Sequence, residues 1–130
     1  MCNLNVIVEG NIFSGFGIDF IGGTSGTLVV DYNLHNISLA HGYGWLVATG
    51  GVQYTSLSSA RAAGYETHGL TGNPKFVAVP NGTVGSGNWQ FQSSSPAINK
   101  GVDLSASFTT DIVGNARSGS WDIGAYQRKK

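Results

Sequence analysis

Asp19, Asp31 and Arg61 are the side chains that could take part in cleaving a polysaccharide. Hydrolysis of a glycosidic bond needs two carboxyl groups flanking the bond. Asp19 and Asp31 lie 12 residues apart, so they need not share one face of the fold. Elimination needs a base and cations that hold an acidic sugar, yet no lysine or arginine precedes Arg61. The sequence therefore argues against a complete lyase site, and these three residues are the weak candidates for catalysis.

Aromatic residues near the middle of the chain suggest a binding site instead. The segment His41-Gly42-Tyr43-Gly44-Trp45 alternates rings with glycines. Rings that are apolar on their faces and polar at one end suit partly wet binding surfaces. The glycines allow a loop that projects these rings, and loops commonly carry binding residues. His41, Tyr43 and Trp45 are the predicted carbohydrate-binding residues.

The histidines do not form a recognisable metal-binding pattern. His35, His41 and His68 lack the His-x-x-x-His spacing of a helical metal site, and Cys2 is the single cysteine. The glycine-rich segment 22–26 lacks the lysine of a phosphate-binding loop. We therefore expect no metal and no cofactor.

The charge balance argues against nucleic acid as a partner. Seven basic residues balance seven acidic ones, and the basic run is the tail Arg128–Lys130. No stretch reaches the roughly 18 apolar residues of a membrane helix. The N-terminus also lacks the charged and apolar segments of a signal peptide. We expect neither nucleic acid nor a membrane as partner.

The secondary structure is expected to consist mainly of short strands. Runs rich in branched and aromatic residues are each ended by Gly, Asn or Ser, which is typical of strands and turns. The predicted strands are 4–8, 11–13, 16–21, 27–30, 75–79 and 88–92. One short helix is predicted over 55–64, with Thr55 or Ser56 as N-cap and Gly64 at its end.

The spacing of these runs leads to the predicted fold. The first four lie too close together for intervening helices, so parallel pairing would require continuous winding. Asn11 and Asn33 each precede apolar residues and lie 22 residues apart, about one coil. The prediction is an all-β right-handed parallel β-helix in one domain, 1–130. Coils would occupy about 1–52, and the helix, last strands and a loop-rich cap 53–130.

A solenoid end exposes its core and unpaired strand edges, so it needs a cap. Glycines in the last third permit tight turns, and the large rings there can cover an open core. Three charged side chains could join these loops in a hydrogen-bonded clasp. The predicted cap residues are Asp111, Gly114, Arg117, Trp121, Asp122 and Tyr126.

Several segments occur in a familiar order. They are Asp31-Tyr32-Asn33-Leu34, Asn73-Pro74-Lys75-Phe76, Ser95-Pro96-Ala97-Ile98-Asn99-Lys100-Gly101, Asp111-x-x-Gly114-x-x-Arg117 and Asp122-Ile123-Gly124-Ala125-Tyr126. Over residues 31–126 the chain resembles the C-terminal region of bacterial right-handed parallel β-helix repeat proteins, of the pectate-lyase-like or choice-of-anchor Q type. The resemblance implies a terminal piece of an extracellular or cell-surface protein.

Three functions remain open at this point. The leading expectation is a non-catalytic end piece that contacts a polysaccharide or another surface. The alternative is a fragment of a polysaccharide lyase or glycoside hydrolase. The third is a structural module that forms homo-oligomers through an exposed N-terminal coil.

Overall fold

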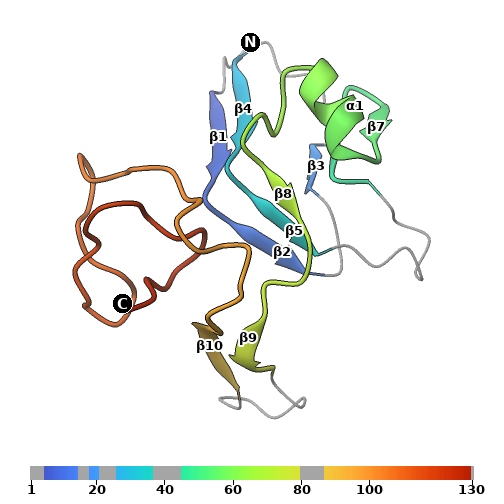
Figure 1. Ribbon diagram of the computed structural model, residues 1–130. Coiled ribbons are helices and arrows are strands. Elements are labelled where there is room, and N and C mark those ends of the chain that lie inside the picture. The colour runs from blue at the N-terminus through green and yellow to red at the C-terminus, as the bar shows by residue number, and fades with distance from the viewer. Residues whose placement is uncertain (1–4, 15–17, 21–25, 37–44, 80–86, 130) are drawn as a thin grey trace.

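The computed structural model describes residues 5–14, 18–20, 26–36, 45–79 and 87–129, with the side chains of 18–20 excepted. Strands dominate its regular structure (Figure 1). The strands are β1 (Val6–Glu9), β2 (Ile12–Ser14), β3 (Ile18–Phe20), β4 (Leu28–Asp31), β5 (Leu34–Asn36), β6 (Val47–Thr49), β7 (Val52–Tyr54), β8 (Leu70–Thr71), β9 (Phe76–Ala78) and β10 (Asn88–Phe91). The helix is α1 (Leu57–Ala62).

The helix follows its sequence signals closely. Ser56 is the N-cap, and its hydroxyl accepts a hydrogen bond from the backbone N–H of Ser59 at 3.1 Å. The Ser59 hydroxyl completes a capping box with the Ser56 backbone. Gly64 takes a φ of 88° just after the helix, a conformation that glycine adopts without strain. The predicted helix is therefore confirmed, with bounds two residues shorter at each end.

The 22-residue spacing reflects parallel pairing of strands. β1 pairs with β4 from Val6 opposite Leu28, and β2 pairs with β5 from Ile12 opposite Leu34. Asn33 Oδ1 accepts hydrogen bonds from the Asn11 backbone N–H at 2.9 Å and from Asn11 Nδ2 at 3.1 Å. The two asparagines thus join neighbouring strands at the bends between β1 and β2 and between β4 and β5.

The prediction of a right-handed parallel β-helix is wrong. The described strands form four small sheets of two or three strands, and none of these sheets forms a solenoid. Two sheets contain antiparallel pairs, β6 with β7 and β9 with β10. Gly50 and Gly51, with φ values of 58° and 79°, turn β6 back onto β7. The hairpin strand β7 therefore lies where a further parallel coil would have paired with β6.

Two apolar clusters hold the strands together. The first is built on Val30, Leu46 and Val47, with Tyr54 and Leu57 packed against it. The second is built on four buried residues, Leu34, Phe91, Ala97 and Ile123. Because the second cluster joins β5 to β10 and to the C-terminal loops, it fixes those loops against the sheets.

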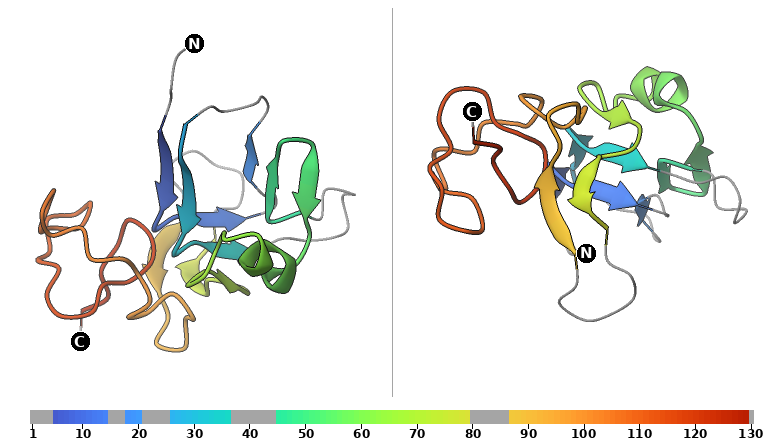
Figure 2. Two further views of the ribbon diagram at one scale, coloured as in Figure 1. Left: turned by 90° about the horizontal axis from the view of Figure 1, so that it is seen from above. Right: turned by 60° about the horizontal axis from the view of Figure 1, so that its bottom comes forward.

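The last part of the chain consists of loops. Between residues 92 and 129 the structure has one isolated bridge, Thr110 with Ala116, and no strand or helix. These loops lie beside the bend between β1 and β2 (Figures 1 and 2). The backbone N–H of Gly124 donates to the carbonyl of Gly10 at 2.9 Å, which joins the two regions.

Candidate functional site

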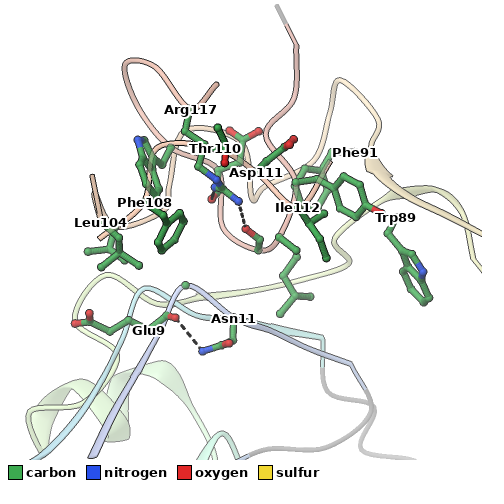
Figure 3. A pocket seen from close by; sticks show the side chains of 18 of the residues that line it. Glu9, Asn11, Trp89, Phe91, Leu104, Phe108, Thr110, Asp111, Ile112 and Arg117 are labelled. Atoms are coloured by element: carbon green, nitrogen blue, oxygen red, sulfur yellow. Dashed lines mark hydrogen bonds between the residues drawn. The ribbon is translucent and has the colours of Figure 1, made fainter. Parts of the chain in front are cut away.

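A cleft of about 1040 Å³ lies between the β1–β2 bend, the β9–β10 hairpin and the C-terminal loops. Figure 3 shows Glu9 and Asn11 on one side of it, with Asp111 and Arg117 of the loops opposite. The volume is in the range of sites that hold a small molecule or several sugar units. This cleft is the candidate functional site.

Aromatic rings form much of the wall of this cleft. They are Phe13, Phe76, Trp89, Phe91, Phe108, Trp121 and Tyr126. Trp89 meets Phe76 edge to face with ring centroids 5.0 Å apart, and Phe108 lies 5.2 Å from Trp121. Trp89 and Phe108 remain 42% and 44% exposed. Their accessible surface is available to a ligand, while the partly buried Phe76 and the buried Trp121 keep them in place.

Arg117 is the cation of the cleft wall. Its guanidinium lies 5.0 Å from the centre of the Trp121 ring and donates to the carbonyls of Asp122, at 3.3 Å, and Gly124, at 2.7 Å. Burial lowers the pKa of Arg117, partly offset by the charges of Asp111 and Asp122. Its Nε atom is buried without a hydrogen-bond partner in the part of the chain that the structure describes. The guanidinium therefore holds the loop in place through hydrogen bonds to two backbone carbonyls, and its positive charge is partly desolvated.

The carboxylate of Asp111 is used to order the C-terminal loops. Oδ1 accepts from the backbone N–H groups of Val113 at 3.0 Å and Asn115 at 2.8 Å. Oδ2 accepts from Asn115 Nδ2 at 3.0 Å and from the backbone N–H of Gln127 at 3.1 Å. Gly114 completes the turn with a φ of 83°. Four donors thus occupy this carboxylate.

Asp122 has a similar arrangement. Oδ1 accepts from the Asn99 backbone N–H at 2.8 Å and Oδ2 from that of Arg128 at 2.7 Å. Among the described residues, no ion pair joins Arg117 to Asp111 or Asp122. The three charged side chains expected to form a clasp lie near one another, but their hydrogen bonds go mainly to the backbone. Trp121 and Tyr126 line the cleft, and Gly114 lies in the adjoining turn.

The side chains of two of the three candidate catalytic residues are described, and neither lines the cleft. Asp19 lies in β3 opposite Ala48, and its side chain falls outside the described part of the chain. Arg61 donates to the carbonyls of Glu66 at 3.1 Å and Gly69 at 2.9 Å. Asp31, at the end of β4, binds His68, which lies in the same loop as Glu66 and Gly69. Asp31 and Arg61 therefore hold one loop, and neither lines the cleft.

Of the predicted carbohydrate-binding residues, one can be placed. His41 and Tyr43 lie outside the described residues. Trp45 is half-buried just before β6 and does not line the cleft. The cleft aromatics come instead from β2, β9, β10 and the last loops. The sequence shows that these aromatic residues are present, but no local pattern in it indicated that they would line one cleft.

A buried polar network lies on the other side of the β1–β2 bend. Glu66 is fully buried, and its Oε1 lies 2.7 Å from His35 Nε2 and 2.8 Å from Asn33 Nδ2. Asn33 Nδ2 also donates to the carbonyl of Val8 at 2.9 Å. Phe13 stacks on the His35 ring, with centroids 5.4 Å apart. Sequence reasoning treated His35 only as a surface or metal-binding histidine and missed Glu66.

Two of the three histidines are thus paired with carboxylates, His35 with Glu66 and His68 with Asp31. Within the described ranges there is no group of three or more His, Cys, Asp or Glu side chains that could hold a metal ion. No helix in those ranges is both long enough and apolar enough to cross a membrane.

Lowering the pH should destabilise the protein through Asp31 and Asp111. Burial alone would raise the pKa of both carboxyls. Hydrogen bonds from His68 and the nearby backbone to Asp31, and from Asn115, Gln127 and Val113 to Asp111, outweigh burial and lower both pKa values. Because each folded-state pKa lies below the ordinary value of 3.8, this stabilisation is present above that pH. It is lost as pH falls through the folded-state pKa values.

Urea unfolding followed at about pH 6 and about pH 3 measures this effect, because the slope of stability with pH counts the protons taken up on unfolding. The free energy of unfolding should be lower at the acidic pH. In Asp111→Asn the difference between the two values should shrink, since one of the two carboxyls is gone. Equal stability of the native sequence at both pH values would contradict the assignment.

No family model, curated protein or solved structure matches this chain. The resemblance to the C-terminal region of β-helix repeat proteins therefore stays a prediction.

Proposed function

We propose that the protein is a binding module that holds a carbohydrate in the cleft between the β1–β2 bend and the C-terminal loops. The observation that carries this proposal is the set of rings along the cleft wall, with Trp89 and Phe108 partly exposed. Binding sites commonly combine apolar and aromatic walls with a few polar groups that orient the ligand. A sugar ring offers an apolar face for such rings and hydroxyl groups for the polar rim.

The polar rim is supplied by short side chains and by one acidic group. Glu9, Asn11, Ser14 and Thr110 border the cleft, and Asn11 Nδ2 is held by the Glu9 carbonyl at 2.9 Å. These groups can donate to and accept from hydroxyl groups. The rim therefore suits a hydroxyl-rich ligand better than a purely apolar one.

The carboxylates of the cleft wall support binding rather than cleavage. A glycosidase uses two carboxyl groups that reach the glycosidic bond. The oxygens of Asp111 and Asp122 accept hydrogen bonds from the backbone of the C-terminal loops. Of the carboxylates that line the cleft, Glu9 has no described side-chain hydrogen bond.

A placement outside the cell, which the resemblance implies, belongs to the same proposal.

Replacing Trp89 by alanine should weaken carbohydrate binding about 10-fold, because tryptophan is enriched among the residues whose truncation removes 1 kcal/mol or more of binding free energy. The screen uses native gels that contain soluble pectin, xylan, β-glucan or alginate, followed by calorimetric titration of whichever polysaccharide retards the protein. Trp89→Phe keeps a ring at this position and should lose less affinity.

Val52→Ala is the control, since Val52 is half exposed on β7 and does not line the cleft. It should bind like the native sequence. If a polysaccharide binds but Trp89→Ala and Val52→Ala behave alike, the ligand does not lie in this cleft. If none of the four polysaccharides binds, carbohydrate is the wrong ligand class.

A further inference from the structure

A histidine–aspartate pair lies outside the cleft, at the end of β4. His68 Nδ1 lies 2.8 Å from Asp31 Oδ2, and the backbone N–H of His68 donates to Asp31 Oδ1 at 2.6 Å. Tyr32 stacks on the His68 ring with centroids 4.4 Å apart and an angle of 11° between the planes. One carboxylate thus fixes both the backbone and the ring of His68.

These contacts determine which nitrogen of His68 faces solvent. Burial raises the pKa of Asp31, but the hydrogen bonds from His68 and Tyr32 outweigh it and lower the pKa, so the carboxylate is ionised at neutral pH. An ionised carboxylate only accepts hydrogen bonds, so Nδ1 must carry the proton. In the neutral imidazole the Nε2 lone pair is then free, and the His68 side chain is 55% exposed.

The surroundings keep this pair in place. Tyr32 holds a φ of 55°, a backbone conformation that costs energy in a residue other than glycine. Arg61 on α1 binds the carbonyls of Glu66 and Gly69, on either side of His68 in the chain. Glu9 lies opposite Asp31 in the β1–β4 register. Of these charged groups, Asp31 contacts the imidazole directly, Glu9 neighbours Asp31 in the sheet, and Arg61 binds the loop on both sides of His68.

We propose that His68 and Asp31 form a second site, in which His68 acts as a general base that activates water for the hydrolysis of esters at the protein surface. Asp31 is the positioning residue, because it holds the imidazole in the tautomer with a free Nε2. This inference goes beyond the proposed function and does not depend on the cleft.

The reaction balances without any further reagent. Nε2 takes a proton from water while the water oxygen attacks the ester carbonyl carbon. The bond between that carbon and the alcohol oxygen then breaks, and the proton on Nε2 goes to the leaving alkoxide. The products are one carboxylic acid and one alcohol, and the imidazole returns to its starting state.

The other described histidine cannot do this chemistry. His35 is 1% exposed, and its Nε2 is bound to Glu66. An ester in solution therefore cannot reach it. Of the two, only His68 combines an oriented ring with an accessible nitrogen.

Hydrolysis of p-nitrophenyl acetate by the whole chain tests the proposal. After subtraction of the spontaneous reaction, His68→Gln should lower the rate at least about 10-fold, since general-base catalysis contributes 10²-fold or more at a positioned side chain. Asp31→Asn keeps an oxygen that can accept the His68 backbone N–H, yet it should also lower the rate. Val52→Ala, at a half-exposed position on β7, is the control and should hydrolyse the ester like the native sequence.

A second measurement uses the native sequence, so it does not depend on how the variants fold. Nitrogen-15 NMR of the imidazole should show a proton on Nδ1 of His68 and none on Nε2 at neutral to basic pH. The reverse tautomer overturns the proposal. So does a His68→Gln rate equal to that of the native sequence. If Asp31→Asn alone is without effect, Asp31 does not position the base and the pair is not a catalytic unit.

Discussion

Replacing Glu66 by alanine should lower the free energy of unfolding by about 3–5 kcal/mol, because the buried groups that it binds lose their acceptor and each such loss costs roughly 1–3 kcal/mol. Glu66 and His35 are 0% and 1% exposed, with 2.7 Å between Oε1 and Nε2. The substitution leaves His35 buried without its carboxylate and Asn33 without an acceptor at 2.8 Å. Each buried polar group left without a partner adds its own desolvation cost.

The side-chain contacts of Glu66 also offset an unfavourable backbone conformation. Glu66 has a φ of 51°, a conformation that side-chain-bearing residues rarely adopt. Its side chain accepts the hydrogen bonds of the network, and its backbone N–H donates to the carbonyl of Val30 at 2.6 Å. Alanine would keep the unfavourable backbone conformation and lose the side-chain contacts that stabilise it.

Urea unfolding monitored by tryptophan fluorescence measures this loss. Glu66→Gln is the matched control, because the amide oxygen can still accept from Asn33 or His35 while the charge is removed. It should cost clearly less than the alanine variant. An alanine variant as stable as the native sequence would show that the network does not stabilise the fold.

Asp111→Ala is the second substitution with a large expected effect, a loss of about 2–3 kcal/mol in the free energy of unfolding, since hydrogen bonds to charged groups are among the stronger ones. The carboxylate joins the turn at residues 113–115 to Gln127, which lies 16 residues after Asp111. Without it, the loops that form one wall of the cleft would lose their connection to the end of the chain. Carbohydrate binding should weaken together with stability.

Thermal unfolding followed by circular dichroism, with the binding assay alongside, measures both effects. Asp111→Asn keeps one acceptor oxygen and should fall between the alanine variant and the native sequence. Asp103→Ala is the matched control, because Asp103 accepts from the backbone of Ser105 in an exposed turn. Its unfolding midpoint should equal that of the native sequence. If the two alanine variants unfold at the same temperature, Asp111 does not organise the loops.

Local sequence signals predicted most of the individual elements. Ser56, Ala60 and Gly64 defined the helix through capping, propensity and termination, which involve residues close in the chain. Short runs of branched and aromatic residues located six strands to within two residues at each end, because strand preference and turn residues are also local. β5 to β8 were not among the predicted strands, since their runs are short and lie next to polar or glycine-rich segments.

Contacts between distant residues decided the fold and the sites. The hairpin of β6 and β7, closed by Gly50 and Gly51, ended parallel pairing in the sheet of β3 and β6, whereas β5 still pairs in parallel with β8. Asp31 meets His68 across 37 residues, and Asn33 meets Glu66 across 33. The sequence by itself determined the element types, the 22-residue pairing distance and the aromatic content. Only the tertiary structure decided which polar groups are in contact. Contacts between residues far apart in the sequence depend on how the whole chain packs, and local sequence patterns carry no information on them.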